Sequence, residues 1–221
     1  MSTCGSIAAE NCSGPRKAGR PLDAAKRRAI VDTAAHLFFH HGYAATSIEQ
    51  VAAAAGVSKV TIYNQFGEKR ALFAAAVECE CEKMRGHFSL DAMPAGTIRE
   101  RLTAIGEAVF DFLFRPEMIQ FERRIAAETE HDPAIGSAFL EAGPRRMKHG
   151  FAAWLRHAES AGDLRIPDAE LAAEQFVSMC KGMGDLERRF GAEVSAEDRH
   201  ARITGAVEVF LAAYGADADH R

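Results

Sequence analysis

Five cysteines and nine histidines are the residues of this 221-residue chain best suited to nucleophilic, acid–base or metal-binding chemistry. The cysteines stand at positions 4, 12, 79, 81 and 180, with no Cys-x-x-Cys pair and no zinc-finger spacing. No His-Glu-x-x-His motif and no phosphate-binding glycine loop accompanies them. Free thiols in a reducing compartment are the simplest interpretation, so we expect no metal, no cofactor and no enzyme active site.

Hydroxyl, amide and ammonium side chains gather in one short segment, residues 58–66, which lies between two glycines. Ser58 is suited to cap a helix over about 59–66. Just before it, Thr46-Ser47-Ile48-Glu49 matches a capping box, in which Thr46 caps a helix of about 47–55 and Glu49 reaches back to the cap's amide. Two short helices joined by a glycine-containing turn form a helix-turn-helix.

The second helix of such a motif enters the major groove of DNA and presents its N-terminal side chains to base edges. Lys59 could reach a guanine edge or a phosphate, while Val60 and the methyl group of Thr61 could touch a thymine methyl group. Residues farther along suit phosphate oxygens, and a lysine at the start of the next helix would add a second phosphate contact. Short helices joined by glycine turns also occur in bundles that bind no DNA, and that alternative stays open. The predicted DNA contacts are Thr46, Ser58, Lys59, Val60, Thr61, Tyr63, Asn64 and Lys69.

Charge is distributed unevenly along the chain. Residues 1–77 have nine Lys and Arg against five Asp and Glu, whereas residues 78–221 have a net charge of −8. A basic N-terminal part on an acidic remainder indicates that the first part binds a polyanion. We expect residues 1–21 to form a flexible basic arm whose Arg16, Lys17 and Arg20 follow the minor groove; the alternative is a solvated tail that binds nothing.

The composition predicts an all-α chain of about nine helices. Alanines number 42, against 29 for Val, Ile and Thr together, and no strand-length stretch alternates apolar and polar residues. Besides the two short helices, helices are expected over about 22–41, 69–87, 97–114, 116–128, 133–160 with a bend at Gly143-Pro144, 168–190 and 196–214. We expect a three-helix helix-turn-helix domain over residues 22–68 and a larger helical domain over residues 69–221.

The first of these regions resembles a known family. Gly42-Tyr43-Ala44-Ala45-Thr46-Ser47-Ile48, the run Val51 to Phe66, Lys69 and Leu72-Phe73 closely resemble the DNA-binding domain of TetR-family transcriptional regulators. The resemblance covers about residues 22–77. Asn64 stands where many members have His, and Glu68 stands where a capping Asn or Ser is usual.

The remainder is similar, more weakly, to the AefR-like ligand-binding domains of that family. The similarity is carried by Phe121-Glu122-Arg123-Arg124, Glu128, Asp132-Pro133, Phe139, Gly143-Pro144, Ala161-Gly162-Asp163-Leu164 and Ala172-Ala173. The resemblance implies a homodimer whose last two helices form a four-helix bundle between subunits, with an effector cavity in each body.

Bulky aromatic and methionine residues in the body suit a cavity for a partly apolar small molecule, with Arg123, Arg124, His149 or Trp154 as a polar contact. The same residues at helical spacing could equally fill an ordinary core. The candidate effector-binding residues are Phe88, Phe110, Phe114, Met118, Phe121, Arg124, Trp154, Met179 and Met183.

The last two expected helices also have apolar residues at helical spacing, which predicts a seam between two protomers. The candidate interface residues are Phe176, Cys180, Val207, Phe210 and Tyr214.

Together these features predict a DNA-binding repressor that a small-molecule effector releases from a near-palindromic operator. A ligand-independent architectural DNA-binding protein and an all-helical enzyme are the alternatives. The longest apolar run, Ala71 to Val77, is far shorter than a membrane span, and the first twenty residues lack a signal-peptide core. We therefore expect no membrane association and a cytoplasmic location.

Overall fold

Helices make up nearly all of the chain that the structure, a computed structural model, describes: residues 21–85 and 96–216. In chain order they are α1 (Pro21–His41), α2 (Ile48–Ala54), α3 (Lys59–Phe66), α4 (Lys69–Arg85), α5 (Ile98–Leu113), α6 (Pro116–Thr129), α7 (Pro133–Leu140), the π-helix η2 (Glu141–Arg145), α8 (Arg146–Ser160), α9 (Ala169–Lys181), α10 (Gly184–Arg189) and α11 (Ala196–Tyr214). Within these ranges the extended pairing is an isolated bridge between Leu164 and Gly215. The predicted all-α class is confirmed.

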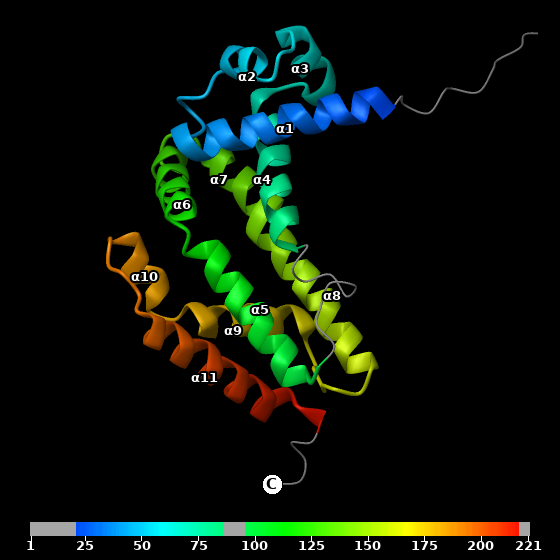
Figure 1. Cartoon of the computed structure of the whole chain (residues 1–221), viewed down its shortest axis with the longest axis vertical. Helices are drawn as coiled ribbons and strands as arrows, with labels where there is room; N and C mark the ends of the chain where they lie inside the picture. The colour runs from blue at the N-terminus through cyan, green and yellow to red at the C-terminus, as the bar shows by residue number, and fades with distance from the viewer. Residues whose placement is uncertain (1–20, 86–95, 217–221) are drawn as a thin grey trace, which may run out of the picture.

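The helix-turn-helix forms one end of the molecule, and α11 lies at the other (Figure 1). α2 and α3 lie beside α1, and α4 leads from them toward the body (Figure 1). α4 packs against α1, while α9 packs against both α8 and α11. No described helix is long and apolar enough to cross a membrane. The expected arm residues Arg16, Lys17 and Arg20, and the candidate Phe88, lie outside the described residues.

The expected capping box at α2 is wrong by one residue. Ser47, not Thr46, caps the helix: its hydroxyl accepts a hydrogen bond from the Gln50 amide, and the Gln50 side chain accepts one from the Ser47 amide. Thr46 is 1% exposed, and its hydroxyl lies 2.8 Å from the Gly42 carbonyl oxygen, to which it donates. Thr46 therefore closes the turn between α1 and α2 from inside.

Two expected long helices are divided in the structure. The bend expected at Gly143-Pro144 is present as η2, the π-helix that contains Pro144 and joins α7 to α8. The helix expected over 168–190 is wrong in its length, because α9 ends at Lys181. The backbone of Gly182 has a positive φ of 49°, which redirects the chain into the short α10.

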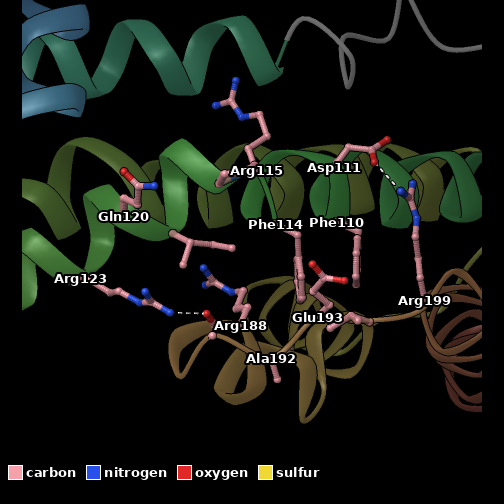
Figure 2. A pocket seen from close by; sticks show the side chains of 14 residues that line it. Phe110, Asp111, Phe114, Arg115, Gln120, Arg123, Arg188, Ala192, Glu193 and Arg199 are labelled. Carbon is pink, nitrogen blue, oxygen red and sulfur yellow. Dashed lines mark hydrogen bonds and ion pairs between the residues drawn. The ribbon is translucent and has the colours of Figure 1, made fainter.

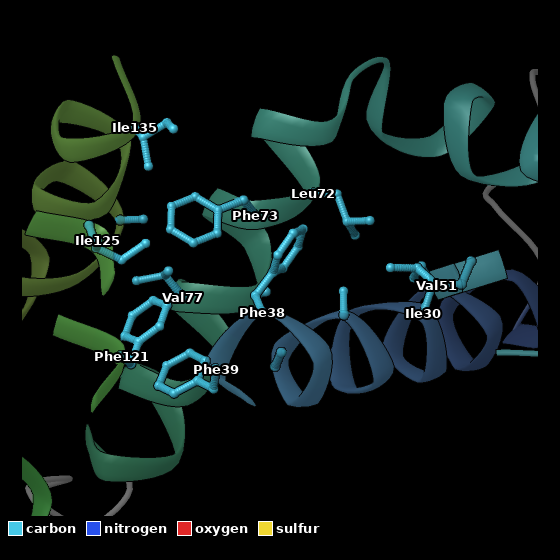
Figure 3. Close-up of a cluster of buried hydrophobic side chains, with 14 of the residues drawn as sticks. Ile30, Phe38, Phe39, Val51, Leu72, Phe73, Val77, Phe121, Ile125 and Ile135 are labelled. Carbon is cyan, nitrogen blue, oxygen red and sulfur yellow. The ribbon is translucent and has the colours of Figure 1, made fainter. Parts of the chain in front are cut away.

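One hydrophobic core joins the helix-turn-helix to the first part of the body. Buried residues of α1 to α4 pack in a single cluster with residues of α6, α7 and η2 (Figure 3). Phe39 of α1 stacks on Phe121 of α6 with ring centroids 3.9 Å apart, and Phe38 meets Phe73 edge-on at 5.3 Å. No break in apolar packing separates residues 22–68 from the residues that follow.

A second core lies among α5, α8, α9 and α11. It contains Phe176, Cys180, Val207 and Phe210, which are at most 1% exposed within the single chain. The prediction that these four residues form a seam between protomers is therefore wrong, because their own protomer already covers them. Tyr214 is only half-buried, and its hydroxyl hydrogen-bonds Gln175.

Candidate nucleic-acid interface and effector cavity

α3 presents an exposed face at the end of the molecule (Figure 1). Val60 is 65% exposed and Tyr63 49% exposed, although both are large apolar or aromatic residues, and Lys59 and Asn64 are exposed beside them. Ile62, on the opposite face, is buried in the core. α3 is thus held from behind and leaves the side chains expected to read DNA free to reach a groove.

The start of α3 is fixed by its cap. The Ser58 hydroxyl accepts a hydrogen bond from the Thr61 amide at 3.1 Å and lies 2.9 Å from the Thr61 hydroxyl. The two hydroxyl groups therefore hold each other, and the Thr61 methyl group remains for an apolar contact.

Lys59 is paired with an acidic residue of α2. Its ammonium nitrogen lies 2.9 Å from a carboxylate oxygen of Glu49. This hydrogen bond raises the pKa of Lys59 and lowers the pKa of Glu49. The pair holds the Lys59 ammonium group against α2, and its two further N–H donors can still contact a phosphate or a guanine.

Lys69 lies at the start of α4, beside the turn between α1 and α2. Its Nζ is 3.4 Å from the Ala44 carbonyl oxygen and 4.3 Å from the centre of the Tyr43 ring. Desolvation lowers the pKa of Lys69, and the nearby Glu128 carboxylate opposes that shift. Three elements therefore meet at this lysine: α4, the turn and α6.

α6 hydrogen-bonds to the same turn through two charged side chains. Arg124 Nη1 donates hydrogen bonds to the carbonyl oxygens of Phe39, at 2.9 Å, and His40, at 2.6 Å. Glu128 accepts one from the Ala44 amide at 3.1 Å. Arg124, expected to bind an effector, instead joins α6 to the end of α1, and it lines neither of the two pockets described below.

A cavity of about 880 Å³ borders this contact between α6 and the end of α1. Its walls are formed by residues of α1 and of α4 to α10. Its walls are mostly apolar and include Phe39, Val77, Met118, Phe139 and Phe151. Of the candidate effector residues, Met118 lines it. Phe121 and Trp154 are core residues, and Met179 and Met183 are not in its wall.

A second pocket of about 630 Å³ lies between α5, α6 and residues 191–194 (Figure 2). The candidates Phe110 and Phe114 line it and stack on each other with ring centroids 3.7 Å apart. Arg123 and Arg188 line both this pocket and the larger cavity.

Both halves of the chain match models of one family. Residues 30–76 match bacterial regulatory proteins of the tetR family, and residues 100–216 match the C-terminal domain of AefR-like transcriptional repressors. The chain belongs to the TetR family. It is a helix-turn-helix transcriptional regulator, as the resemblance implied, and members of this family are regulators rather than enzymes.

Similar TetR-family proteins extend over most of the chain. The regulator BetI of Rhizobium meliloti is 26% identical over 195 residues, which cover 88% of this chain and 93% of BetI. A TetR-family regulator of Mesorhizobium loti is 27% identical, with a TM-score of 0.72 over 89% of this chain and 100% of its own. The flavonoid-responsive regulator FrrA is 29% identical, with a TM-score of 0.67 over 87% of this chain and 98% of its own.

The sequence of this TetR-family chain did not predict the roles of several charged residues near the cavity. Glu122 and Glu128 belong to the segment that resembles AefR-like domains, and their place in that charged run was the available signal. Arg188, in contrast, lies within an ordinary polar helical stretch, and no spacing or motif distinguishes it.

Leu140 of α7 is 42% exposed, and the other exposed large apolar side chains of the described body lie on α9, α10 and α11 and at their ends. They are Leu171, Met183, Leu186, Phe190 and Val209, each at least 49% exposed within the described chain. Phe190 is the extreme case at 83%. An apolar surface on the last helices is thus present, but on residues other than those expected.

Proposed function

We propose that this TetR-family regulator is a homodimeric repressor that binds a near-palindromic operator and releases it when a partly apolar small molecule occupies the cavity. The exposed face of α3, with Val60 and Tyr63 turned to solvent above the buried Ile62, is the observation that carries the DNA-binding part. Each protomer reads one half-site, and the two readers lie about 34–36 Å apart or a multiple of it.

The structure supports distinct tasks for the reading residues. Val60 and Thr61, at the start of α3, suit apolar contacts to thymine methyl groups, whereas Tyr63 and Asn64 suit phosphate oxygens. Lys59 replaces its ion pair with Glu49 by a contact to DNA. Thr46 contributes by holding the turn, since its buried hydroxyl has its partners inside the protein.

The arm stays part of the proposal, now as residues 1–20, because α1 begins at Pro21. Its Arg16, Lys17 and Arg20 follow the minor groove beside the half-site, because basic extensions are attracted to the negative potential there. Removal of residues 1–20 lowers operator affinity in this proposal and leaves the dimer intact.

α6 connects the cavity to the DNA-reading end, which is the helix-turn-helix of α1 to α3. Met118 and Ile125 line the cavity, and Arg124 and Glu128 on the same helix hold the turn before α2. A ligand that shifts α6 therefore shifts the turn and the neighbouring Lys69. By thermodynamic linkage, DNA and effector then weaken each other's binding by the same factor.

The exposed apolar residues of α9 to α11 support a two-fold interface formed by the last helices. Obligate interfaces are apolar and commonly bury more than about 2,000 Å² in total. Leu171, Leu186, Phe190 and Val209 are the side chains that a partner would cover, and Tyr214 lies half-buried near the end of α11. The proposal also places the regulator in the cytoplasm, where a bacterial operator lies.

Selection of binding sites from random duplex DNA, followed by affinity measurements, tests this function. A palindromic consensus bound by two chains supports it, and substitution of Val60 or Thr61 is expected to change the preferred base while Tyr63→Ala weakens all sites alike. Absence of any preferred sequence would refute it in favour of an architectural protein. A reporter gene placed behind the selected operator decides between repression and activation.

A further inference from the structure

The polar end of the large cavity is built around a buried arginine. Arg188 of α10 is 3% exposed, and it lines both the large cavity and the second pocket. Figure 2 shows its guanidinium group between α6 and the 191–194 segment, close to Phe114. Its central carbon lies 5.3 Å from the centre of the Phe114 ring.

The guanidinium group of Arg188 is only partly satisfied by the protein. Its Nη2 lies 2.7 Å from a carboxylate oxygen of Glu122 and 2.7 Å from one of Asp185, and its Nε donates to Asp185 at 3.2 Å. Its Nη1 is buried and has no hydrogen-bond acceptor among the described residues. A buried donor without an acceptor is unfavourable, so this nitrogen favours any ligand that brings an oxygen to it.

The charges of the cavity wall indicate whether the ligand group that brings this oxygen is anionic or neutral. The chain as a whole has a net charge of −4. The wall nevertheless has six basic side chains, those of Arg123, Arg145, Lys148, Lys181, Arg188 and Arg189, against the two acidic side chains of Glu122 and Glu174. Five of the six have an acidic partner: Arg145 pairs with Glu141, Lys148 with Glu174, and Lys181, Arg188 and Arg189 with Asp185. Together with Glu122, these carboxylates balance part of the positive charge, and the excess that remains in a partly desolvated space favours an anion over a neutral or cationic group.

The rest of the wall defines the body of the ligand. Ile105, Val109, Phe112, Met147 and Phe151 give it an apolar and partly aromatic surface. A volume of about 880 Å³ falls within the range of about 300–1,000 Å³ that small-molecule sites occupy.

We propose that the effector is an apolar, aromatic acid whose anionic oxygen accepts a hydrogen bond from Nη1 of Arg188. This inference rests on the proposed function, because it names the chemical class of that function's effector. The anion enters next to the Arg188–Glu122 pair, and Glu122 belongs to α6, the helix that also holds the turn before α2. The charge of the ligand therefore acts on α6, the helix that contacts the DNA-reading end.

Two fluorescent probes that differ by one anionic group test the proposal. 8-Anilinonaphthalene-1-sulfonate is an aromatic anion, and N-phenyl-1-naphthylamine is the same skeleton without the sulfonate. We expect the full-length wild type to bind one sulfonate probe per chain about tenfold more tightly than the neutral probe, since a charge-assisted hydrogen bond is worth about that factor.

Arg188→Lys is the decisive variant, because it keeps one positive charge beside Glu122 and Asp185 but removes the second guanidinium nitrogen. It should lower the affinity for the sulfonate probe about tenfold and leave the affinity for the neutral probe within about twofold. The matched control is Arg156→Gln, which removes an exposed arginine paired with Glu170 outside the cavity wall. That control should leave both affinities unchanged.

Glu122→Gln provides an independent variant should Arg188→Lys fail to fold, as judged by circular dichroism. It removes the carboxylate that competes for Arg188, and sulfonate binding should therefore tighten. Equal affinity for the two probes in the wild type, or the same affinity ratio in the wild type and in a folded Arg188→Lys, would overturn the inference. Operator binding by the same preparations is measured separately, so loss of the anion site and loss of the DNA-binding function are distinguishable.

Discussion

Replacing Gly42 with alanine tests whether the turn between α1 and α2 depends on α6. Gly42 has a φ of 88°, a left-handed conformation that costs a residue with a side chain about 1–2 kcal/mol. A Cβ atom at this position would lie 2.7 Å from a carboxylate oxygen of Glu128. The carboxylate would have to move, and we expect this movement to break the hydrogen bond that its other oxygen accepts from the Ala44 amide at 3.1 Å.

Gly56→Ala is the matched control. Gly56 also has a positive φ, of 65°, but a Cβ atom there would meet nothing within 4 Å. Both substitutions therefore incur the backbone cost, and only Gly42→Ala also loses the Glu128 hydrogen bond, worth about 1 kcal/mol at this partly exposed site. For a chain of this size, about 1 kcal/mol corresponds to a difference in melting temperature of about 2–4 °C.

The assay is thermal unfolding of the two variants at one protein concentration, in the wild-type and the Glu128→Ala backgrounds. We expect Gly42→Ala to melt about 2–4 °C below Gly56→Ala in the wild-type background and at the same temperature in the Glu128→Ala background. Equal melting temperatures of the two glycine variants in the wild-type background would refute the contribution assigned to Glu128.

Three further predictions concern DNA binding and assembly. Lys69→Ala should reduce the slope of log affinity against log salt by about one, measured by fluorescence anisotropy, and an unchanged slope would remove Lys69 from the phosphate contacts. Glu49→Gln frees Lys59 from its partner at 2.9 Å and should raise operator affinity at low salt; unchanged affinity would mean that the pair does not compete with DNA. Phe190→Glu should give a folded monomer in sedimentation and weaker operator binding, whereas Val207→Glu should unfold the chain because it buries a charge in the protomer's own core. A dimer that survives Phe190→Glu with unchanged stability would place the interface elsewhere.

Local signals in the sequence were sufficient for most of the helix-turn-helix. Ser58 caps α3 as predicted, because its hydroxyl accepts a hydrogen bond from the Thr61 amide, which the first turn of the helix leaves free, and the two residues before it, Gly56 and Val57, have no hydroxyl to compete. At α2 two adjacent hydroxyl residues compete for the cap, and Thr46 is drawn inward by the Gly42 carbonyl while Ser47 caps the helix. Which one caps depends on the packing of the turn, and the four-residue pattern alone does not contain that information.

The body was harder to predict, because helical spacing gives the apolar face of a helix but not what covers it. Phe176 and Phe210 recur at intervals that suit either an interface or an internal core, and in the structure they meet each other within one chain at 5.3 Å. The cavity depends on where seven or more helices leave space, so bulky residue types alone identified Met118 and missed Phe139, Phe151 and Arg188. Such positions are set by tertiary packing rather than by local propensity.

Five residues belong both to the core that joins the two halves and to the cavity wall: Phe39, Val77, Cys81, Met118 and Ile125. A ligand in the cavity therefore adds its binding free energy to the stability of the DNA-reading end, in proportion to the logarithm of its concentration above its Kd. The same overlap limits modular exchange. A chimera that joined this chain's first 76 residues to a relative's body would cut through this shared core, so the contact between α1 and α6 would have to be repacked for the two parts to fit.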